Sequence, residues 1–273
     1  MTQHWFWKNW VILSCLAAVC FGSCNLTVGG LTSVGIGSVL YFNTGSLIYS
    51  VGYFIKRKFT PGSPINYGPP VWVCFNAFMQ LLIIWCVTLT FSTSQMAGLN
   101  PGIACTIWNL TPFISGLGDR VIYKQGIKTS AIIGMVLLLI CGVLVSLSSL
   151  FKTADPVGEA FKPTLSLWVP VVCSFAMPLC CAIMQHSAKY SMTICGSNPS
   201  DFCNAFWVIF SVVLQVGCII KYSAHIPSTA VMDWNLWAIG ALGSLINCWG
   251  GFFATSAIGT GKPAGPMAAL FSS

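Results

Sequence analysis

The sequence predicts an all-α membrane protein, a multi-pass helical bundle of two inverted five-helix repeats. Three observations support this prediction. Of the 273 residues, 56% are hydrophobic and only 6% are charged, whereas about 25% are charged in typical soluble domains. Apolar stretches recur at lengths that suit a bilayer, and most basic residues lie in every second gap between them. The two halves of the chain also resemble each other weakly.

The apolar stretches define the expected spans. A helix needs ~20 mainly apolar residues to cross a hydrocarbon core of ~30 Å. Eight stretches meet this need, at residues 10–28, 37–55, 71–92, 96–121, 129–150, 167–188, 201–220 and 236–258. A ninth apolar run starts near Pro263 and reaches Ser273, which is too short to cross. We therefore expect that the last one or two helices are missing from this chain.

The basic residues predict the orientation. If every span crosses, nine of the twelve Lys and Arg lie on the side of the N-terminus: Lys8, Lys56, Arg57, Lys58, Arg120, Lys124, Lys128, Lys189 and Lys262. The other side holds Lys152, Lys162 and Lys221. Basic loops stay in the cytosol, so we expect a cytosolic N-terminus.

Composition also excludes some partners. The net charge of +7 does not indicate nucleic acid, because no basic stripe alternates with aromatic residues. Contact with anionic lipid headgroups is the expected role of these charges. The fourteen cysteines lie mostly inside apolar runs and form no CxxC motif. We therefore expect neither a metal site nor a cofactor.

An internal duplication is the next feature. Residues 94–101 can be laid on residues 256–263, and Trp10 and Cys15 then fall near the matching Trp168 and Cys173. The unit is about 160 residues long and holds five helices, with residues 1–155 as the first repeat and 156–273 as an incomplete second. An odd number of helices forces the second unit to insert upside down. Inverted repeats are typical of transporters, with the substrate site between the halves.

Several short motifs fall between residues 98 and 148. They are Gly98-Leu-Asn-Pro-Gly-Ile-Ala, Asn109-Leu-Thr-Pro-Phe-Ile, Tyr123-Lys-Gln-Gly-Ile-Lys, Ile133-Gly-Met and Cys141-Gly-Val-Leu. This stretch resembles the drug/metabolite transporter superfamily, specifically the EamA-like group. The resemblance implies ten helices in two inverted halves and transport of small metabolites by alternating access. The chain departs from that family at Gln125, where members often have a glutamate.

Charged residues are not expected at the centre of the bundle. The five carboxylates fall in loops or near helix ends: Asp119, Asp155, Glu159, Asp201 and Asp233. A charge at a helix centre costs ~2.5 to 3.5 kcal/mol on insertion scales, so one retained there would indicate function. A proton-coupled mechanism through a midplane carboxylate is therefore disfavoured.

Uncharged polar residues are the candidates for substrate binding. Asn76 and Gln80 are four residues apart and share one helix face. Trp108 and Asn109 lie together in the fourth span, and Asn247 lies in the eighth. A polar face inside a membrane must meet another helix or water. Each residue alone is better explained as one that holds helices together through hydrogen bonds. As a group they are our candidate lining of a substrate cavity.

Two prolines are candidate hinges. Pro101 and Pro263 lie near the starts of the fourth and ninth helices, each flanked by glycines. Such a proline indicates either a broken helix at a substrate site or an ordinary helix start. Lys262 is a further candidate to bind substrate, although its side chain could instead extend to the headgroups.

Other functional classes fit less well. Asp119-Arg120-Val-Ile-Tyr123 is similar to the acid-arginine motif of heptahelical receptors, but it ends the fourth span and not the third. Three histidines cannot form a di-iron cluster, and no Walker loop is present, so no catalytic residues are expected and the chain is not predicted to be an enzyme. The sequence favours a secondary transporter of a small polar metabolite in the lipid bilayer. The alternative is a non-transporting receptor or scaffold, and a homodimer stays open.

Overall fold

The fold is helical throughout the described part of the chain. This computed structural model describes residues 9–32, 41–60, 62, 64–99, 106–151, 165–166, 168–224 and 234–272. The helices are α2 (Trp10–Thr32), α3 (Thr44–Phe59), α4 (Pro70–Met96), the 3₁₀ helix η2 (Ile107–Leu110), α6 (Thr111–Ile122), α7 (Thr129–Phe151), α8 (Trp168–Thr193), α9 (Pro199–Ala224), α10 (Trp234–Ile258) and α11 (Ala264–Ser272). No strand occurs among the described residues.

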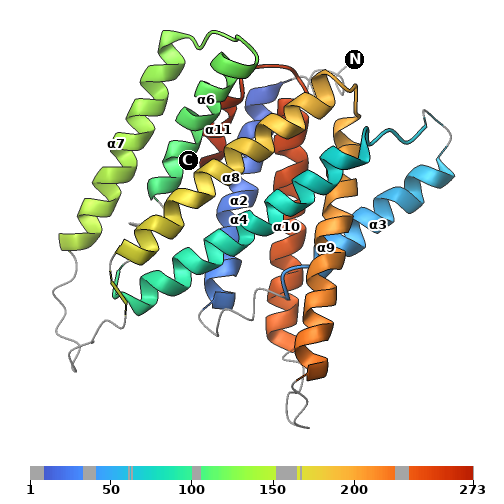
Figure 1. Cartoon of the computed structure of the whole chain (residues 1–273), viewed down its shortest axis with the longest axis horizontal. Coiled ribbons are helices and arrows are strands. Elements are labelled where there is room, and N and C mark those ends of the chain that lie inside the picture. The colour runs from blue at the N-terminus through green and yellow to red at the C-terminus, as the bar shows by residue number, and fades with distance from the viewer. Residues whose placement is uncertain are drawn as a thin grey trace.

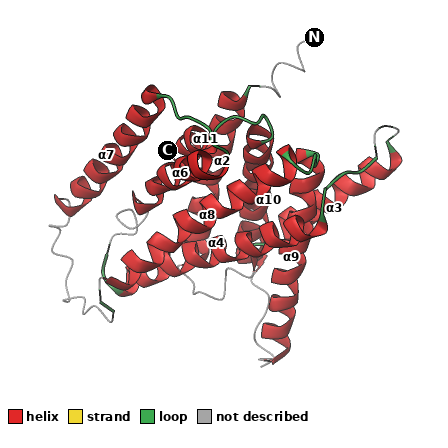
Figure 2. Ribbon diagram, turned by 45° about the horizontal axis from the view of Figure 1, so that its top comes forward, coloured by secondary structure: helices red, strands yellow, loops and turns green. Residues whose placement is uncertain are grey.

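The helices pack in pairs that are distant in sequence. α2 lies against α10, and α4 crosses the molecule beside α8 (Figure 1). α3 contacts both α9 and α10, and α6 contacts both α8 and α11. α7 lies at one edge (Figure 2), where η2 and α11 are its main neighbours. Helices of the first half, α2 to α7, therefore pack mostly on helices of the second half, α8 to α11.

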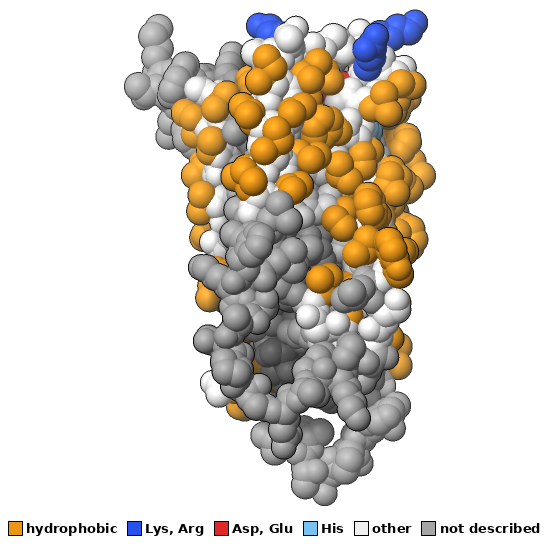
Figure 3. Space-filling model, turned by 90° about the vertical axis from the view of Figure 1, so that its left-hand side faces the viewer, with side chains coloured by type: hydrophobic (Ala, Val, Ile, Leu, Met, Phe, Trp, Pro, Cys, Tyr) orange, Lys and Arg blue, Asp and Glu red, His pale blue; other side chains and the backbone are white. Residues whose placement is uncertain are grey.

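Five helices are long and apolar enough to cross a membrane. They are α2, α4, α8, α9 and α10, and a shorter apolar helical stretch, Thr129–Cys141, lies in α7. Large apolar side chains face outward, such as Leu26 at 79% and Val19 at 68% exposure. In the described part of the face shown in Figure 3, hydrophobic side chains predominate, and Lys and Arg lie at one end. These are the features of a multi-pass membrane protein.

Two of the expected spans differ from the helices more than the others do. The second, expected at 37–55, is the 16-residue α3, which begins at Thr44 and ends at Phe59. At 1.5 Å per residue, 16 residues extend only about 24 Å, and the last turn holds Lys56, Arg57 and Lys58. The expected span ended at residue 55 because the apolar residues stop there. The helix continues through the three basic residues that follow.

The expected fourth span over 96–121 is not a single α-helix. α4 continues to Met96, and the chain then turns at Gly98, which has a left-handed φ of 66°. The next elements that the structure describes are η2 and then α6, with Pro112 in the first turn of α6. Proline cannot donate the helical hydrogen bond to the Trp108 carbonyl. The Thr111 hydroxyl donates to that carbonyl at 2.7 Å, as does the Thr111 backbone N–H, and the helix tightens locally.

Glycines let α10 approach its neighbours closely. A Cβ atom added at Gly250 would lie 2.8 Å from the Phe21 ring of α2, and one at Gly240 would lie 2.6 Å from the Tyr41 carbonyl. The same holds between α6 and α11, where a Cβ at Gly265 would lie 2.7 Å from the Gly116 Cα. Small residues at such crossings are how membrane helices gain packing contacts without a hydrophobic driving force.

Candidate functional site

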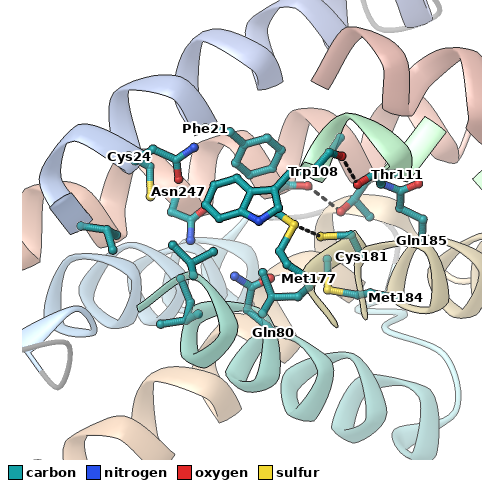
Figure 4. A pocket seen from close by; sticks show the side chains of 18 of the residues that line it. Phe21, Cys24, Gln80, Trp108, Thr111, Met177, Cys181, Met184, Gln185 and Asn247 are labelled. Atoms are coloured by element: carbon teal, nitrogen blue, oxygen red, sulfur yellow. Dashed lines mark hydrogen bonds between the residues drawn. The ribbon is translucent and has the colours of Figure 1, made fainter. Parts of the chain in front are cut away.

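A cavity of about 420 Å³ lies between the two halves of the bundle (Figure 4). Its walls come from α2, α4, η2 and α6 in the first half and from α8, α9 and α10 in the second. Its volume falls within the range of roughly 300–1,000 Å³ that is usual for small-molecule sites. The cavity is therefore large enough to hold a small metabolite.

Two buried amides face this cavity without protein partners. Gln80 of α4 is 6% exposed and Asn247 of α10 is 4% exposed, and both line the cavity. Neither side chain makes a hydrogen bond to another described residue. In Figure 4 both side chains point into the same space as Trp108. Buried polar groups are normally paired, so these amides can bind a ligand or water.

Nine of the other 23 lining residues are aromatic or sulfur-bearing. They are Phe21, Cys24, Phe91, Trp108, Met177, Cys181, Met184, Phe206 and Trp207. The Trp108 ring meets Phe91 edge to face at 6.0 Å, which fixes the indole in the wall. Its Nε1–H is buried and has no partner among the described residues. Trp108 therefore offers its ring to the cavity, whereas its buried Nε1 atom is not exposed there.

None of the described lining residues carries a charge. The polar members of the wall are amides and hydroxyls: Asn25, Gln80, Thr111, Gln185, Asn247 and Thr255. The wall thus offers neutral donors and acceptors next to apolar and aromatic surface.

The structure brings together three of the six binding residues that the sequence predicts. Gln80, Trp108 and Asn247 line the cavity. Asn76 does not; it is fully buried and donates to the Trp72 carbonyl at 2.9 Å and to Ser187 Oγ at 3.0 Å. Asn109 is half-buried in η2 and is not among the lining residues, and Lys262 is exposed in the turn between α10 and α11.

Of the two candidate hinges, Pro263 is described, and it is not among the residues that line the cavity. Pro263 directly precedes α11, which begins at Ala264, so its position is that of an ordinary helix start. Pro101 lies outside the described residues. The described irregularity in this region is η2, which lies just before Pro112.

Sequence reasoning missed several cavity residues. Asn25 lies in the first apolar span, where an amide is as unusual as at Asn76, and it lines the cavity. On α8, Met177, Cys181 and Met184 follow helical spacing and face the same space. The amide at Asn25 was a usable signal, whereas a sulfur-bearing face on an apolar helix looks like ordinary core.

A buried ion pair closes the bundle at its basic end. Asp119 of α6 and Lys189 of α8 lie 2.7 Å apart, at 0% and 1% exposure. Lys189 Nζ also donates to Gln125 Oε1 at 2.7 Å and lies 4.5 Å from the centre of the Tyr123 ring. The backbone N–H of Gly265 donates to Asp119 Oδ2 at 3.0 Å. We call these five residues the Asp119 network; it joins α6, α8 and α11.

Tyr123 lies just after α6 and continues this network. Its hydroxyl donates to the His186 carbonyl at 2.8 Å. Burial, followed by the negative charge of Asp119, raises the pKa of Tyr123 to about 12. The hydroxyl therefore stays protonated at neutral pH and remains a donor. Gln125 Nε2 donates in turn to the Gly261 carbonyl at 3.3 Å, which connects the α6–α7 loop to the α10–α11 turn.

A second cluster ties α3, the α3–α4 loop and α9 together at the same end. Asp201, which is fully buried, accepts from the Tyr53 hydroxyl at 2.7 Å and from the Asn66 backbone at 2.9 Å. Arg57 Nε lies 3.4 Å from Asp201 Oδ1. Asn66 also accepts from the Asn198 backbone at 2.9 Å. We call Asp201, Tyr53, Arg57 and Asn66 the Asp201 network.

One turn of helix separates the Asp119 network from the cavity. Ser115 Oγ of α6 donates to Gln185 Oε1 of α8 at 2.8 Å, and Gln185 lines the cavity. Ser115 and Asp119 are four residues apart, as are Gln185 and Lys189, so the two bonds form successive rungs between α6 and α8. Separation of α6 from α8 at this end would have to break both rungs.

Comparison with known proteins adds no family to this description. No protein-family model and no curated protein matches the chain. Among the described residues, no group of three His, Cys, Asp or Glu side chains could hold a metal ion. The functional argument therefore depends on the cavity and on the two networks.

Proposed function

We propose that this chain is a secondary transporter that moves a small metabolite across a membrane by alternating access. The observation that carries the proposal is a ligand-sized cavity between the two halves of a bundle with helices long enough to span a membrane, lined by two buried amides that have no partner among the described residues. Transporter sites lie near the midplane between structural repeats.

The pattern of helix contacts supports a two-fold relation between the halves. If α2, α3, α4 and α6 are exchanged with α8, α9, α10 and α11, the contact of α2 with α10 becomes that of α8 with α4. The contact of α3 with α10 likewise becomes that of α9 with α4, and that of α2 with α11 becomes that of α8 with α6. All of these contacts occur. The contact of α9 with α10 has no counterpart of similar extent. α2 and α8 also begin at Trp10 and Trp168, the residues that the internal similarity pairs.

The Asp119 and Asp201 networks support a conformation in which the basic end of the bundle is closed. Asp119, Lys189 and Asp201 are buried with their charges paired, and they join helices of opposite halves. Interfaces of packed helices switch between discrete arrangements and do not deform continuously. A rocking motion of one half on the other would open the basic end by separating these pairs, and it would close the opposite end around the cavity.

Counterflow uptake in proteoliposomes tests the proposal. Purified full chain is reconstituted, loaded with one unlabelled metabolite at a time from a panel, and given labelled tracer outside. We expect transient tracer accumulation above the external concentration for at least one compound, and none in protein-free liposomes. Failure with every compound, in a preparation that elutes as a folded monodisperse protein, would reject transport and leave the scaffold as the better account.

A further inference from the structure

We propose that the cavity binds an uncharged heteroaromatic ligand of nucleobase or nucleoside size. The inference deepens the transporter proposal and rests on it only in taking the cavity as the binding site. Three properties of the wall lead to it: the absence of charge among the described lining residues, the aromatic and sulfur-rich surface, and the unpaired buried amides.

The uncharged wall excludes ionic ligands. None of the described lining residues is Asp, Glu, Lys, Arg or His. A ligand charge would lose its hydration in a cavity that offers no counter-charge, and desolvation of an unpaired ion is costly. The charged side chains at the basic end are not available as partners, because Asp119 and Lys189 already pair with each other.

The aromatic wall favours a ligand with a π system. Phe21, Phe91, Trp108 and Trp207 come from four different elements and all face the cavity, and Met177 and Met184 lie among them. Aromatic rings pair with other rings in stacked or edge-to-face geometry, and thioethers make favourable contacts with ring edges. A flat ring therefore gains more from this wall than an aliphatic or sugar-like ligand would.

The unpaired amides select a ring that carries both donors and acceptors. Gln80 and Asn247 each present a carbonyl oxygen and an amino group, and neither is used by a described neighbour. An amide can pair with the edge of a heterocycle through one donated and one accepted hydrogen bond. A plain hydrocarbon ring would leave the two amides without partners. Leaving a buried polar group unpaired costs more free energy than one hydrogen bond usually gains.

Equilibrium dialysis of the purified full chain tests this ligand class. The probes are two matched pairs that differ in charge, nicotinamide with nicotinate and adenosine with adenosine monophosphate, together with glucose as an uncharged ligand without an aromatic ring. We expect at least one uncharged heterocycle to bind, and to bind roughly 100-fold more tightly than its charged partner. Glucose should bind at least about tenfold more weakly than that heterocycle.

Two variants connect the binding to the amides. Gln80→Met and Asn247→Leu keep a side chain of similar shape but remove the hydrogen bonds, and each should weaken binding by about tenfold. Asn109→Leu is the matched control, because Asn109 lies in η2 outside the cavity wall, and it should bind as the wild type does. Unliganded thermal unfolding of each variant shows whether it is folded.

Three results would overturn the inference: charged partners that bind as tightly as the uncharged ones, glucose that binds as tightly as the heterocycles, or no binding of any probe at up to about 10 mM. The outcome is separable from that of the transport assay. Binding of adenosine without counterflow would reject the transport proposal and support the proposed ligand class. Counterflow of an anionic metabolite would support the transport proposal and reject the uncharged ligand class.

Discussion

The basic end of the bundle and the central cavity both bury polar side chains, but only those at the basic end are paired within the described residues. At the basic end, each charged member of the Asp119 and Asp201 networks has a partner within 3.4 Å. In the cavity, Gln80 and Asn247 are nearly as buried and have none among the described residues. A buried group without a partner costs about 1–3 kcal/mol. We interpret the first region as a structure that holds helices together and the second as a surface that a ligand completes.

The largest expected effect comes from breaking the Asp119 network. Lys189→Met leaves the Asp119 carboxylate buried with no cation, which should lower the free energy of unfolding by about 3–5 kcal/mol. Thermal unfolding of the purified protein measures the loss. The double variant Asp119→Asn with Lys189→Met should recover most of it, because no unpaired charge remains. Lys262→Met is the control, since Lys262 is exposed. A loss no larger than that of this control would contradict the structural role.

The Asp201 network should respond less strongly. Asp201→Asn weakens three interactions at one carboxylate, but Arg57 keeps 21% of its side chain exposed and can be solvated. We expect a loss of about 2 kcal/mol in the free energy of unfolding, measured in the same way. Lys58→Met, an exposed neighbour in α3, should change little. If Asp201→Asn proved as damaging as Lys189→Met, the distinction between a fully buried pair and a partly exposed one would be lost.

A smaller effect is expected where α6 meets α11. Gly265→Ala places a Cβ 2.7 Å from the Gly116 Cα and 3.0 Å from the Pro112 carbonyl. Overpacking costs about 1–3 kcal/mol, and the better helix propensity of alanine offsets about 1 kcal/mol, which leaves a net loss of about 1 kcal/mol. Gly134→Ala in α7 is the matched control, because nothing lies within 4 Å of its added Cβ. Equal melting temperatures for the two variants would show that the α6–α11 contact is looser than described.

The smallest stability effect should come from the cavity itself. Gln80→Met removes an amide that has no described protein partner and that water in the unliganded cavity can solvate, so the free energy of unfolding should stay within about 0.5 kcal/mol of the wild type. Asn76→Leu, one turn away on α4, removes bonds to Ser187 and Trp72 and should cost about 1 kcal/mol. Thermal unfolding of the two variants side by side measures the difference. A reversed order would mean that Gln80, and not Asn76, is the residue that holds the helices together.

Much of the fold was predictable from the sequence, and the reasons are local. Expected spans such as 129–150 and 236–258 follow from apolar length alone and agree with α7 and α10 within two residues. The fourth span was not predictable, because an apolar run does not show that Gly98 turns the chain or that Pro112 interrupts the helical ladder. α3 was placed too early because its C-terminal turn is basic.

The candidate site was predictable only in part, because a helix face does not name its neighbour. Asn76 and Gln80 share one face by spacing, yet Asn76 meets Ser187 of α8 and Gln80 meets the cavity. The pairing of Asp119 with Lys189 was likewise not predictable from the sequence. The sequence indicates only that Asp119 lies near a helix end, and its partner is 70 residues away.

Counterflow in matched variants tests most directly the central claim, that the cavity between the halves is the path of the substrate. The compound with the highest uptake in the wild type is measured again in the double variant Gln80→Met with Asn247→Leu, and in Asn109→Leu. We predict that the double variant loses at least about 90% of the initial rate, since two lost hydrogen bonds amount to more than tenfold in binding, while Asn109→Leu retains it. Equal rates in the wild type and in the folded double variant would contradict the account.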